Sequence, residues 1–562
     1  MARDLGHRCR CPHGTRCPRG PRHGGPAAAV LDTHVRAFPM DAAEQALWRE
    51  CGMDPVSLEA DVTTMLSCLH YILPGRPVVS HQAALSALLP PQDDADRISD
   101  LPEKLLHNIV SRLPPKDGAR TAALSCRWRS VWLSTPLVLV DADLLPTGCG
   151  SGLQVARADA RRVASAITRI LEAHQGPFRF VHLISCYMQE TPGLLARWLQ
   201  LLAVKGVREL FLVNRPWPLS MALPATFFGM ATLTRLYLGV FGFPATAGLP
   251  RAVAFPHLRE LGLCCMAIKN RDMDFVLARS PVLEILCIHA NILLKCLSLV
   301  SRSLRCVQIL EGIDLNLDVK DAPHLERLII WSSSARDGLH RGVKIGHAPA
   351  LSILGYLEPA RHVLEIGNTI IKAGTRASPT TIVPSIKILS LRVCFGIHSD
   401  DKMLPSFLRC FPNVERLHLE SNETDEPTGK LNTKCWKDAG PIECIQSHIK
   451  LMIFYAFRGE RNELSFLKFF LENARMLTKL VIVFWKGSFS SMTEANSKVK
   501  PLFAAKWASQ DCVLQLFESA LEVGDDKWLL NFETGSDFSS RDPFACTAAL
   551  RGCNFEEMAG VH

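Results

Sequence analysis

The stretches LTRLYLGV at 233–240, LRELGLCC at 258–265 and LEILCIHA at 283–290 repeat one pattern of apolar residues. In each stretch, leucine or isoleucine stands at the first, fourth and sixth positions. The fourth and sixth positions alternate in an extended strand, so their side chains point to the same face. One such strand cannot bury its apolar side alone, and neighbouring copies must stack to share a core. The pattern therefore predicts a stack of repeated strands.

Further copies of the pattern lie on both sides of these three stretches. Most steps measure roughly 21 to 28 residues, which is the period of leucine-rich repeats. The predicted solenoid is irregular, because the ninth position, where regular repeats favour Asn or Cys, matches only at Asn291, Cys394 and Asn422. Two long steps predict surface loops at 373–384 and 423–434. The apolar positions of the further copies are Val207, Leu210 and Leu212; Leu304, Val307 and Ile309; Leu325, Leu328 and Ile330; Leu351 and Leu354; Ile386, Leu389 and Leu391; and Val414, Leu417 and Leu419.

Polar and aromatic side chains occupy the outward positions between and just after these leucines. Tyr, Trp and Arg dominate interface hot spots, and a concave sheet presents such residues in rows. We therefore expect a protein target on this face, although any one of these side chains is more often an ordinary solvated or half-buried residue. The candidate target-binding residues are Arg235, Tyr237, His289, Gln308, Trp331, Arg392, Arg416 and His418.

A second signal is the stretch RISDLPEKLLHNIVSRLPPKDGARTAALSCRWRSVWLST at 97–135. A proline suits the first turn of its first helix, where the missing N–H costs little. Leu101, Leu105, Ile109 and Leu113 recur every four residues, which places them on one helix face. Paired prolines stop this helix, and two further short helices are expected after it. A unit of this size buries too little surface to be stable alone, so the apolar face is expected to meet a partner or the following domain.

This stretch resembles the F-box, because it has the Leu-Pro start, the leucine spacing, a second Leu-Pro and the tail LS-x-RWR-x-x-W. The resemblance implies that its helices bind a Skp-type adaptor, which a cullin links to a ubiquitin-conjugating enzyme. The alternative is a generic helical hairpin whose apolar stripe is core. The residues that the resemblance assigns to adaptor binding are Leu101, Pro102, Leu105, Ile109, Leu113, Leu124, Trp128 and Trp132.

The block at 436–484 resembles the FBD domain, which follows an F-box and leucine-rich repeats in many plant proteins. The residues themselves predict a strand at 449–457, a helix at 464–475 and a strand at 477–484. A terminal repeat that caps the solenoid would have the same elements. In the tail beyond this block, a helix is expected at 512–521. The positions that match the FBD domain are Pro441, Glu443, Cys444, His448, Ile449, Gly459, Phe466, Phe469, Leu471, Asn473, Ala474 and Leu477.

The N-terminal part has a different composition. The net charge of the 562-residue chain is +8, but six Arg against one Asp in the first 25 residues put about +5 of it in a basic tail. Residues 1–39 are expected to be disordered, or to be a leader upstream of a true start at Met40. Their Cys and His residues lack the paired spacing of a zinc site. Residues 40–90 are expected to be helical and to pack on the F-box or on a second helix of their own. Their apolar stripe is Leu58, Val62, Met65, Leu69 and Ile72.

Composition and motif searches narrow the function classes. The cysteines are scattered through apolar runs and no secretory signal opens the chain, so a cytoplasmic or nuclear protein with free thiols is expected. No long uncharged apolar run occurs, so no membrane span is predicted. Phosphate-binding loops, zinc-protease motifs, nucleophile elbows and dinucleotide fingerprints are absent, so no catalytic residue, metal or cofactor is predicted. Aromatic residues do not alternate with basic ones, which disfavours nucleic acid as a partner.

Together these signals predict an α/β protein in which an N-terminal helical F-box precedes an irregular leucine-rich repeat solenoid capped by an FBD domain. The resemblance implies a substrate-recognition subunit of an SCF-type ubiquitin ligase, which acts by proximity rather than catalysis. Two alternatives stay open: a scaffold that binds the adaptor without delivering targets, and a nucleic-acid-associated protein steered by the Arg-rich tail. The predicted segments are 1–39 basic tail, 40–95 helical extension and linker, 96–140 F-box, 141–435 solenoid, 436–490 FBD domain and 491–562 C-terminal tail.

Overall fold

The computed structural model describes most of the chain from residue 65 onward. The predicted basic tail at 1–39 lies outside the described residues, as do most of the helical extension and nearly all of the predicted loop at 423–434. The predicted loop at 373–384 is described and contains no helix or strand. The described residues are 65–75, 97–113, 115–145, 155, 157–188, 192–215, 221–291, 293–310, 315–332, 340–423, 436, 440–522 and 531–545.

Three short helices follow one another in the predicted F-box: α3 (Glu103–Val110), α4 (Pro115–Thr121) and α5 (Cys126–Ser134). The backbone carbonyl of Pro102 accepts a hydrogen bond from the N–H of Leu105 at 2.9 Å, which starts α3. A proline is also the first residue of α4, where its missing N–H costs no helical bond. The Ser125 hydroxyl caps α5 by accepting the Trp128 N–H at 3.3 Å. The predicted trio of helices is confirmed.

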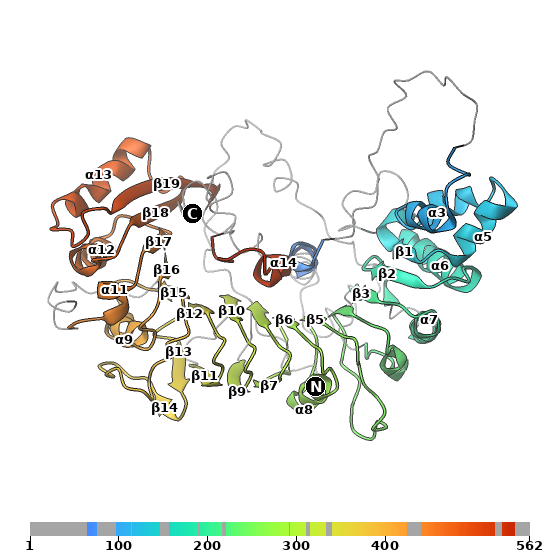
Figure 1. Ribbon diagram of the computed structural model, residues 1–562, viewed down its shortest axis with the longest axis horizontal. Helices are drawn as coiled ribbons and strands as arrows, with labels where there is room; N and C mark the ends of the chain where they lie inside the picture. The colour runs from blue at the N-terminus through green and yellow to red at the C-terminus, as the bar shows by residue number, and fades with distance from the viewer. Residues whose placement is uncertain are drawn as a thin grey trace, which may run out of the picture.

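A single sheet of 14 strands runs from the F-box to the C-terminal part of the chain (Figure 1). Adjacent strands follow the order of the chain and are parallel, apart from the strands that leave to form a second sheet. This is the arrangement that the repeat pattern predicts. The strands are β1 (Leu137–Val140), β2 (Phe178–Leu183), β3 (Glu209–Val213), β4 (Arg235–Gly239), β5 (Glu260–Cys264), β6 (Ile285–His289), β8 (Cys306–Leu310), β10 (Arg327–Ser332), β12 (Ile353–Leu357), β15 (Ile388–Val393), β16 (Arg416–Ser421), β17 (Leu451–Tyr455), β18 (Lys479–Lys486) and β19 (Val513–Glu522).

The register of the large sheet aligns the fourth position of every predicted repeat. Leu236 pairs with Leu261, and Leu261 pairs with Leu286. The row continues without a break through the later repeats as far as Leu417 and Met452. These side chains are buried in one continuous apolar core. The core therefore lies behind the sheet, on the side to which the repeated leucines point.

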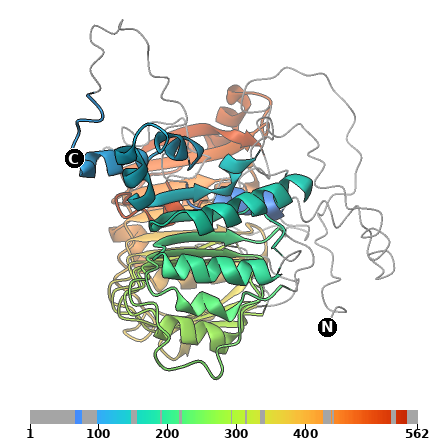
Figure 2. The ribbon, with the colours of Figure 1, turned by 90° about the vertical axis from the view of Figure 1, so that its right-hand side faces the viewer.

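Helices and a smaller second sheet cover that core on the outer, convex side. Figure 2 shows helices of the first repeats stacked side by side on this surface. Among the described residues, no helix is both long and apolar enough to cross a membrane. The covering helices are η2 (Asp141–Leu144), α6 (Arg157–Ala173), α7 (Pro192–Val204), η4 (Ala225–Gly229), α8 (Asn270–Ala278), α9 (His398–Arg409), α11 (Glu443–Ser447), α12 (Arg461–Asn473) and α13 (Met492–Phe503). The second sheet contains β7 (Cys296–Val300), β9 (Asn316–Asp321), β11 (Arg341–His347), β13 (His362–Ile366) and β14 (Thr369–Ile370).

The predicted FBD block continues the large sheet. Its strand, helix and strand are β17, α12 and β18, close to the expected bounds. The helix expected at 512–521 is wrong, because this segment is the edge strand β19. Leu514 and Leu516 alternate in β19 and pack against the main core, and β19 pairs in parallel with β18. The apolar residues of this segment recur with the period of two that is typical of a strand, rather than the period of 3.6 that is typical of a helix.

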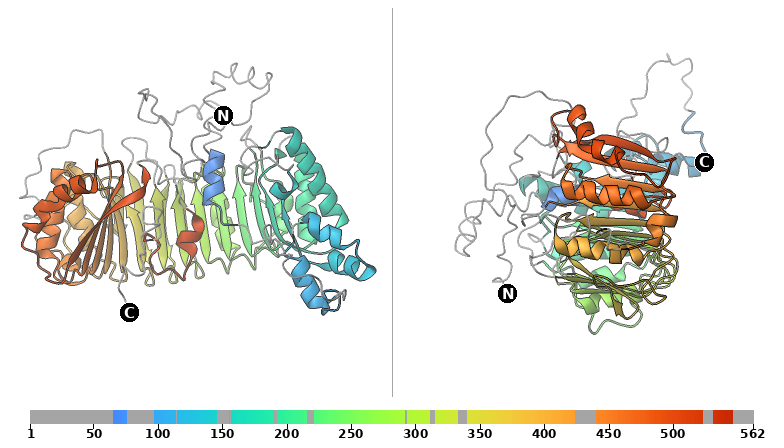
Figure 3. Two further views of the ribbon diagram at one scale, coloured as in Figure 1. Left: turned by 90° about the horizontal axis from the view of Figure 1, so that it is seen from above. Right: turned by 90° about the vertical axis from the view of Figure 1, so that its left-hand side faces the viewer.

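The inner, concave face of the large sheet carries two further segments. One is the short helix at 65–72, and the other contains α14 (Phe532–Ser536). Figure 1 shows both on the inner side of the arc, and Figure 3 shows them lying over the middle strands. The expectation that the N-terminal extension packs on the F-box is therefore wrong for residues 65–72. Their leucines dock on the strands instead and join a buried apolar cluster with side chains of the concave face.

Candidate functional site

The F-box helices enclose a small core of their own. Leu106, Val110, Trp128 and Val131 form a buried apolar cluster. The indole N–H of Trp128 donates a hydrogen bond to the Ser99 hydroxyl at 2.9 Å. This cluster fixes the angle between α3 and α5 and determines which side chains remain outside.

Several apolar side chains of the F-box are exposed to solvent. Leu105 is 49% exposed and Ile109 is 39% exposed, one turn apart on α3. Leu124, just before α5, is 67% exposed. Pro102 is also exposed. Apolar side chains this exposed on a small helical unit are typical of a docking surface.

The other predicted adaptor residues lie deeper. Leu101 and Leu113 are half-buried. The prediction that both tryptophans face a partner disagrees with the burial of Trp128. Trp132 is half-buried, and the centre of its ring lies 5.3 Å from that of His174. Its ring also packs against Gly118 of α4, where an added Cβ would lie only 2.5 Å from it. The tryptophans therefore hold the F-box together and join it to the solenoid.

The sequence analysis did not identify Leu106 and Val110 as core residues of the F-box, although both are fully buried. They follow Leu105 and Ile109 by one residue, and a four-residue spacing fits both pairs equally well. Only the fold distinguishes the buried pair from the exposed pair. The exposed set that remains for a partner is Pro102, Leu105, Ile109 and Leu124, which we call the F-box face.

All eight predicted target-binding residues project from strands of the large sheet on its concave side, but none is strongly exposed. Arg235, Arg392 and Arg416 are half-buried, and the other five, Tyr237, His289, Gln308, Trp331 and His418, are buried. The two segments on the concave face account for this burial. Whether these side chains bind a target stays a prediction.

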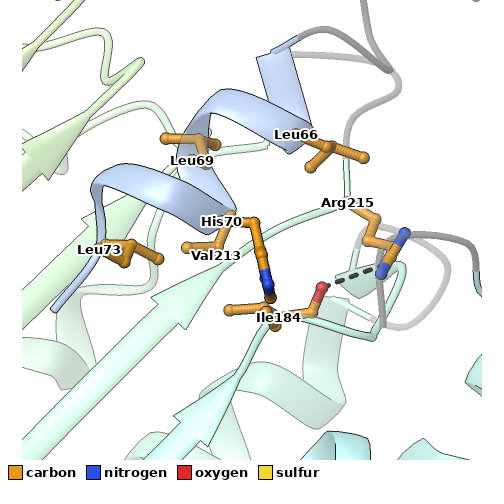
Figure 4. Close-up of a pocket in the computed structure, with 7 residues that line it drawn as sticks. All are labelled: Leu66, Leu69, His70, Leu73, Ile184, Val213 and Arg215. Atoms are coloured by element: carbon orange, nitrogen blue, oxygen red, sulfur yellow. Dashed lines mark hydrogen bonds between the residues drawn. The ribbon is translucent and has the colours of Figure 1, made fainter. Parts of the chain in front are cut away.

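Helix 65–72 covers the concave face between β3 and β6. Leu66, Leu69 and Leu73 are buried there against Val213 and Ile184, around a small pocket (Figure 4). Figure 4 also shows the Arg215 guanidinium, whose Nε donates to the Ile184 carbonyl at 3.1 Å.

Two thiols flank the imidazole of His289 beneath this helix. Cys68 Sγ of helix 65–72 lies 3.7 Å from Nε2, and Cys265 Sγ lies 3.6 Å from Nδ1. In the described ranges no group of three or more His, Cys, Asp or Glu residues is placed to hold a metal ion. The buried imidazole of His289 thus joins helix 65–72 to the sheet through its contacts with Cys68 and Cys265.

Residues 531–545, which we call the C-terminal strap, cover the middle strands. Gln308 Nε2 donates to the carbonyl of Phe532 at 2.8 Å, while its Oε1 accepts the Trp331 indole N–H at 2.9 Å. The Arg327 guanidinium donates to three strap carbonyls, those of Gly535 at 2.9 Å, Asp537 at 3.0 Å and Ser540 at 2.7 Å. This half of the strap is held through backbone carbonyls and through two aromatic side chains. Phe532 is buried beside Tyr237, and the Arg305 guanidinium lies 3.9 Å from the centre of the Phe538 ring.

The last residues of the strap are held through their side chains. Asp542 Oδ2 lies 3.0 Å from His418 Nε2 and 3.3 Å from the Arg416 guanidinium. Burial alone would raise the pKa of Asp542, but His418 and Arg416 together lower it below its usual range. The carboxylate is therefore the ionised partner of two basic side chains.

An aromatic pocket adjoins this charged contact. The ring centroid of Phe544 lies 5.1 Å from that of Tyr356, 5.4 Å from that of His418 and 5.9 Å from that of Trp331. The Tyr455 hydroxyl donates to the Phe544 carbonyl at 3.2 Å. Sequence reasoning missed this contact, because Asp542 and Phe544 lie in a tail without periodicity.

The two remaining predicted arginines are paired within the sheet. Arg235 Nε lies 2.9 Å from Glu260 Oε2, and Arg392 Nε lies 3.0 Å from Glu420 Oε2. Arg392 also stacks on Tyr356 at 4.4 Å, on the wall of the aromatic pocket. The concave face is therefore a polar and aromatic surface that binds a peptide segment of its own chain.

Comparison with known proteins supports the domain order that the fold suggests. A model of the F-box domain matches residues 98–139. A model described as FBD-associated F-box protein At5g56370, LRR repeats, matches residues 195–419, and the FBD model matches residues 437–482. A helical F-box, leucine-rich repeats and an FBD domain thus follow one another along the chain.

Proteins of Arabidopsis thaliana are similar to this chain. The F-box/FBD/LRR-repeat protein At2g04230 is 24% identical over 474 residues, which cover 75% of this chain and 97% of the relative. The FBD-associated F-box protein At5g60610 is 26% identical over 410 residues, which cover 68% of this chain and 98% of the relative. The putative F-box protein At1g67390 is 35% identical over 134 residues, 23% of this chain and 26% of the relative. The chain belongs to the plant F-box/LRR/FBD proteins.

Proposed function

We propose that this protein is the substrate-recognition subunit of an SCF-type ubiquitin ligase. In this proposal the F-box face binds a Skp-type adaptor, and a cullin connects that adaptor to the ubiquitin-conjugating enzyme. The leucine-rich repeat region holds the target protein. The cytoplasm or the nucleus is the proposed location, consistent with the free thiols of the described cysteines.

The observation that carries the proposal is the F-box face. Leu105, Ile109 and Leu124 are large apolar side chains that the fold leaves in water, although neighbouring leucines and valines are buried. Covering them with a partner removes apolar area from water, at roughly 25 cal/mol per Å². The F-box also lies at one end of the solenoid, which leaves its outer side accessible (Figure 1).

The proposed mechanism is proximity. A target held on the solenoid and a conjugating enzyme held through the adaptor share one complex, so the reaction between them becomes effectively intramolecular. The chain itself then contributes no acid, base or nucleophile.

An adaptor pull-down tests the proposal. The double variant Leu105→Asp, Ile109→Asp should weaken adaptor binding roughly tenfold or more, because two charges replace apolar contacts at the centre of the interface. Both side chains are exposed, so the variant should unfold at the same temperature as the wild type. Val204→Asp is the matched control, since Val204 is 86% exposed at the end of α7, outside the F-box.

Binding of the wild type and of Val204→Asp, with loss in the double variant, would support the proposal. Failure of the wild type to bind any Skp-type adaptor would contradict it. A scaffold that binds the adaptor without delivering targets is distinguished by the next step, in which the assembled ligase must ubiquitinate proteins captured by the solenoid.

A further inference from the structure

The end of the C-terminal strap sits in a site built from four strands. Trp331 comes from β10, Tyr356 from β12, Arg416 and His418 from β16, and Tyr455 from β17. These side chains surround Asp542 and Phe544, whose exposed fractions are 5% and 0%. The site therefore holds two side chains of a peptide that turns at residues 542–545, an acid and an aromatic ring two positions later.

The chemistry of this site is selective. His418 is buried and Arg416 is half-buried, and both face the same carboxylate oxygen. Removing that carboxylate would leave the buried His418 and the half-buried Arg416 without their acidic partner, which is costly in a low-dielectric environment. The adjacent pocket presents three ring faces or edges, which favour an aromatic side chain over an aliphatic one.

The rest of the strap is held through its backbone and through the side chains of Phe532 and Phe538. Phe532 is buried against Tyr237, and the Arg305 guanidinium lies 3.9 Å from the centre of the Phe538 ring. Arg327 donates to the backbone carbonyls of Gly535, Asp537 and Ser540, which the end of α14 and the turn after it bring together. Asp542 and Phe544 add a charged contact and an aromatic pocket, and this pair of neighbouring contacts is the part of the strap whose chemistry is most selective.

We propose that the concave face carries a recognition site for peptides with an acidic residue two positions before an aromatic residue, and that Asp542 and Phe544 of this chain occupy it in cis. The inference rests on the proposed function, because it names the class of target that the solenoid binds. A target peptide gains access when it displaces the strap. Covalent attachment gives the strap a high effective concentration, so free peptides compete poorly with it.

A binding experiment with the strap sequence tests this inference. The probe is the fluorescently labelled peptide DFSSRDPFA, residues 537–545, followed by fluorescence anisotropy. The full chain carrying Asp542→Asn and Phe544→Ala should bind this peptide roughly tenfold or more tighter than the wild-type chain does, because its own strap no longer fills the site.

Variant peptides supply the specificity control. A peptide with Asp542→Asn or with Phe544→Ala should bind the same chain roughly tenfold more weakly. A peptide with Ser539→Ala should bind unchanged, since Ser539 is exposed in the strap. A folded double variant that fails to bind, or that binds all four peptides equally, would overturn the inference.

Hydrogen exchange on the wild-type chain keeps the inference testable if the double variant does not fold. Excess native peptide should accelerate amide exchange within residues 531–545, and the Asn and Ala peptides should not. Unchanged exchange with excess native peptide would overturn the inference.

The adaptor pull-down of the wild-type chain separates this result from the proposed function. Adaptor binding without peptide binding would remove only the recognition site. Peptide binding without adaptor binding would remove the ligase role and leave the site in place.

Discussion

Asp401 in α9 is a buried carboxyl group whose surroundings oppose its ionisation. Its Oδ2 accepts the Gly396 N–H at 3.2 Å, whereas its Oδ1 has no hydrogen-bond partner among the described residues. Burial, aided by the negative charge of Asp400, raises the pKa of Asp401 to about 7. Near neutral pH the folded chain therefore holds a proton at Asp401 that the unfolded chain has released.

This difference predicts how stability depends on pH. Because the folded-state pKa is the higher one, the contribution of Asp401 is most favourable below about pH 4 and is lost as pH rises to about 7. Asp401→Asn keeps an acceptor for the Gly396 N–H and cannot ionise. We expect the variant to be more stable than the wild type at pH 8, by up to about 4 kcal/mol.

Chemical denaturation at pH 5 and pH 8 measures this effect. The gain from Asp401→Asn should be larger at pH 8 than at pH 5, while the neighbouring exposed Ser399→Ala should give no pH-dependent difference. An equal effect of Asp401→Asn at both pH values would show that the carboxyl group does not take up a proton on folding.

Single residues also show where sequence reasoning reaches its limit. The leucines of the repeats could be assigned to the core, because their positions recur in many copies and a strand has only two faces. Trp128 could not be assigned, because α5 is a single short helix. Its spacing to Trp132 fits either an inward or an outward face until α3 is placed against it.

At the scale of elements, the repeats and the FBD block were predictable and the two segments on the concave face were not. Strands β4, β5 and β6 follow directly from their pattern. The strap has no apolar period, and it contacts Gln308 and Arg327 more than 200 residues earlier in the chain. Such contacts depend on individual side-chain pairs, which a single sequence does not reveal.

One glycine controls how closely α14 approaches the sheet. A Cβ on Gly535 would lie 2.0 Å from Gln308 Oε1. Gln308 cannot move freely, because it is buried and bonded to both Trp331 and the Phe532 carbonyl. Gly535→Ala must therefore lift α14 or break these bonds.

We expect Gly535→Ala to increase amide exchange within residues 531–545 by roughly tenfold or more, which corresponds to a loss of about 1.4 kcal/mol of docking free energy. The core behind the sheet should remain protected, since its leucines do not contact α14. Thr534→Ala, one residue earlier, is the control and should leave exchange unchanged. Equal exchange in both variants would mean that the strap tolerates the added methyl group.

At the scale of the whole molecule, the two proposed surfaces lie on different parts of one continuous sheet. The F-box face is at one end, beyond β1, and the site that holds Asp542 and Phe544 spans β10 to β17 (Figure 1). Allosteric coupling needs an element with two arrangements that both ligands bias. The strands between the two surfaces form one uninterrupted ladder of parallel pairs.

This arrangement predicts that adaptor and target bind independently. For the chain with Asp542→Asn and Phe544→Ala, saturating adaptor should change the affinity for the strap peptide by about twofold or less, because we expect the uninterrupted ladder of strands between the two sites to keep one arrangement. Linkage requires that peptide change adaptor affinity by the same factor, so either titration checks the other. A change of roughly fivefold or more in both titrations would show that adaptor binding reshapes the solenoid. In that case the chain would gate access to its targets, instead of acting only as a rigid spacer between target and enzyme.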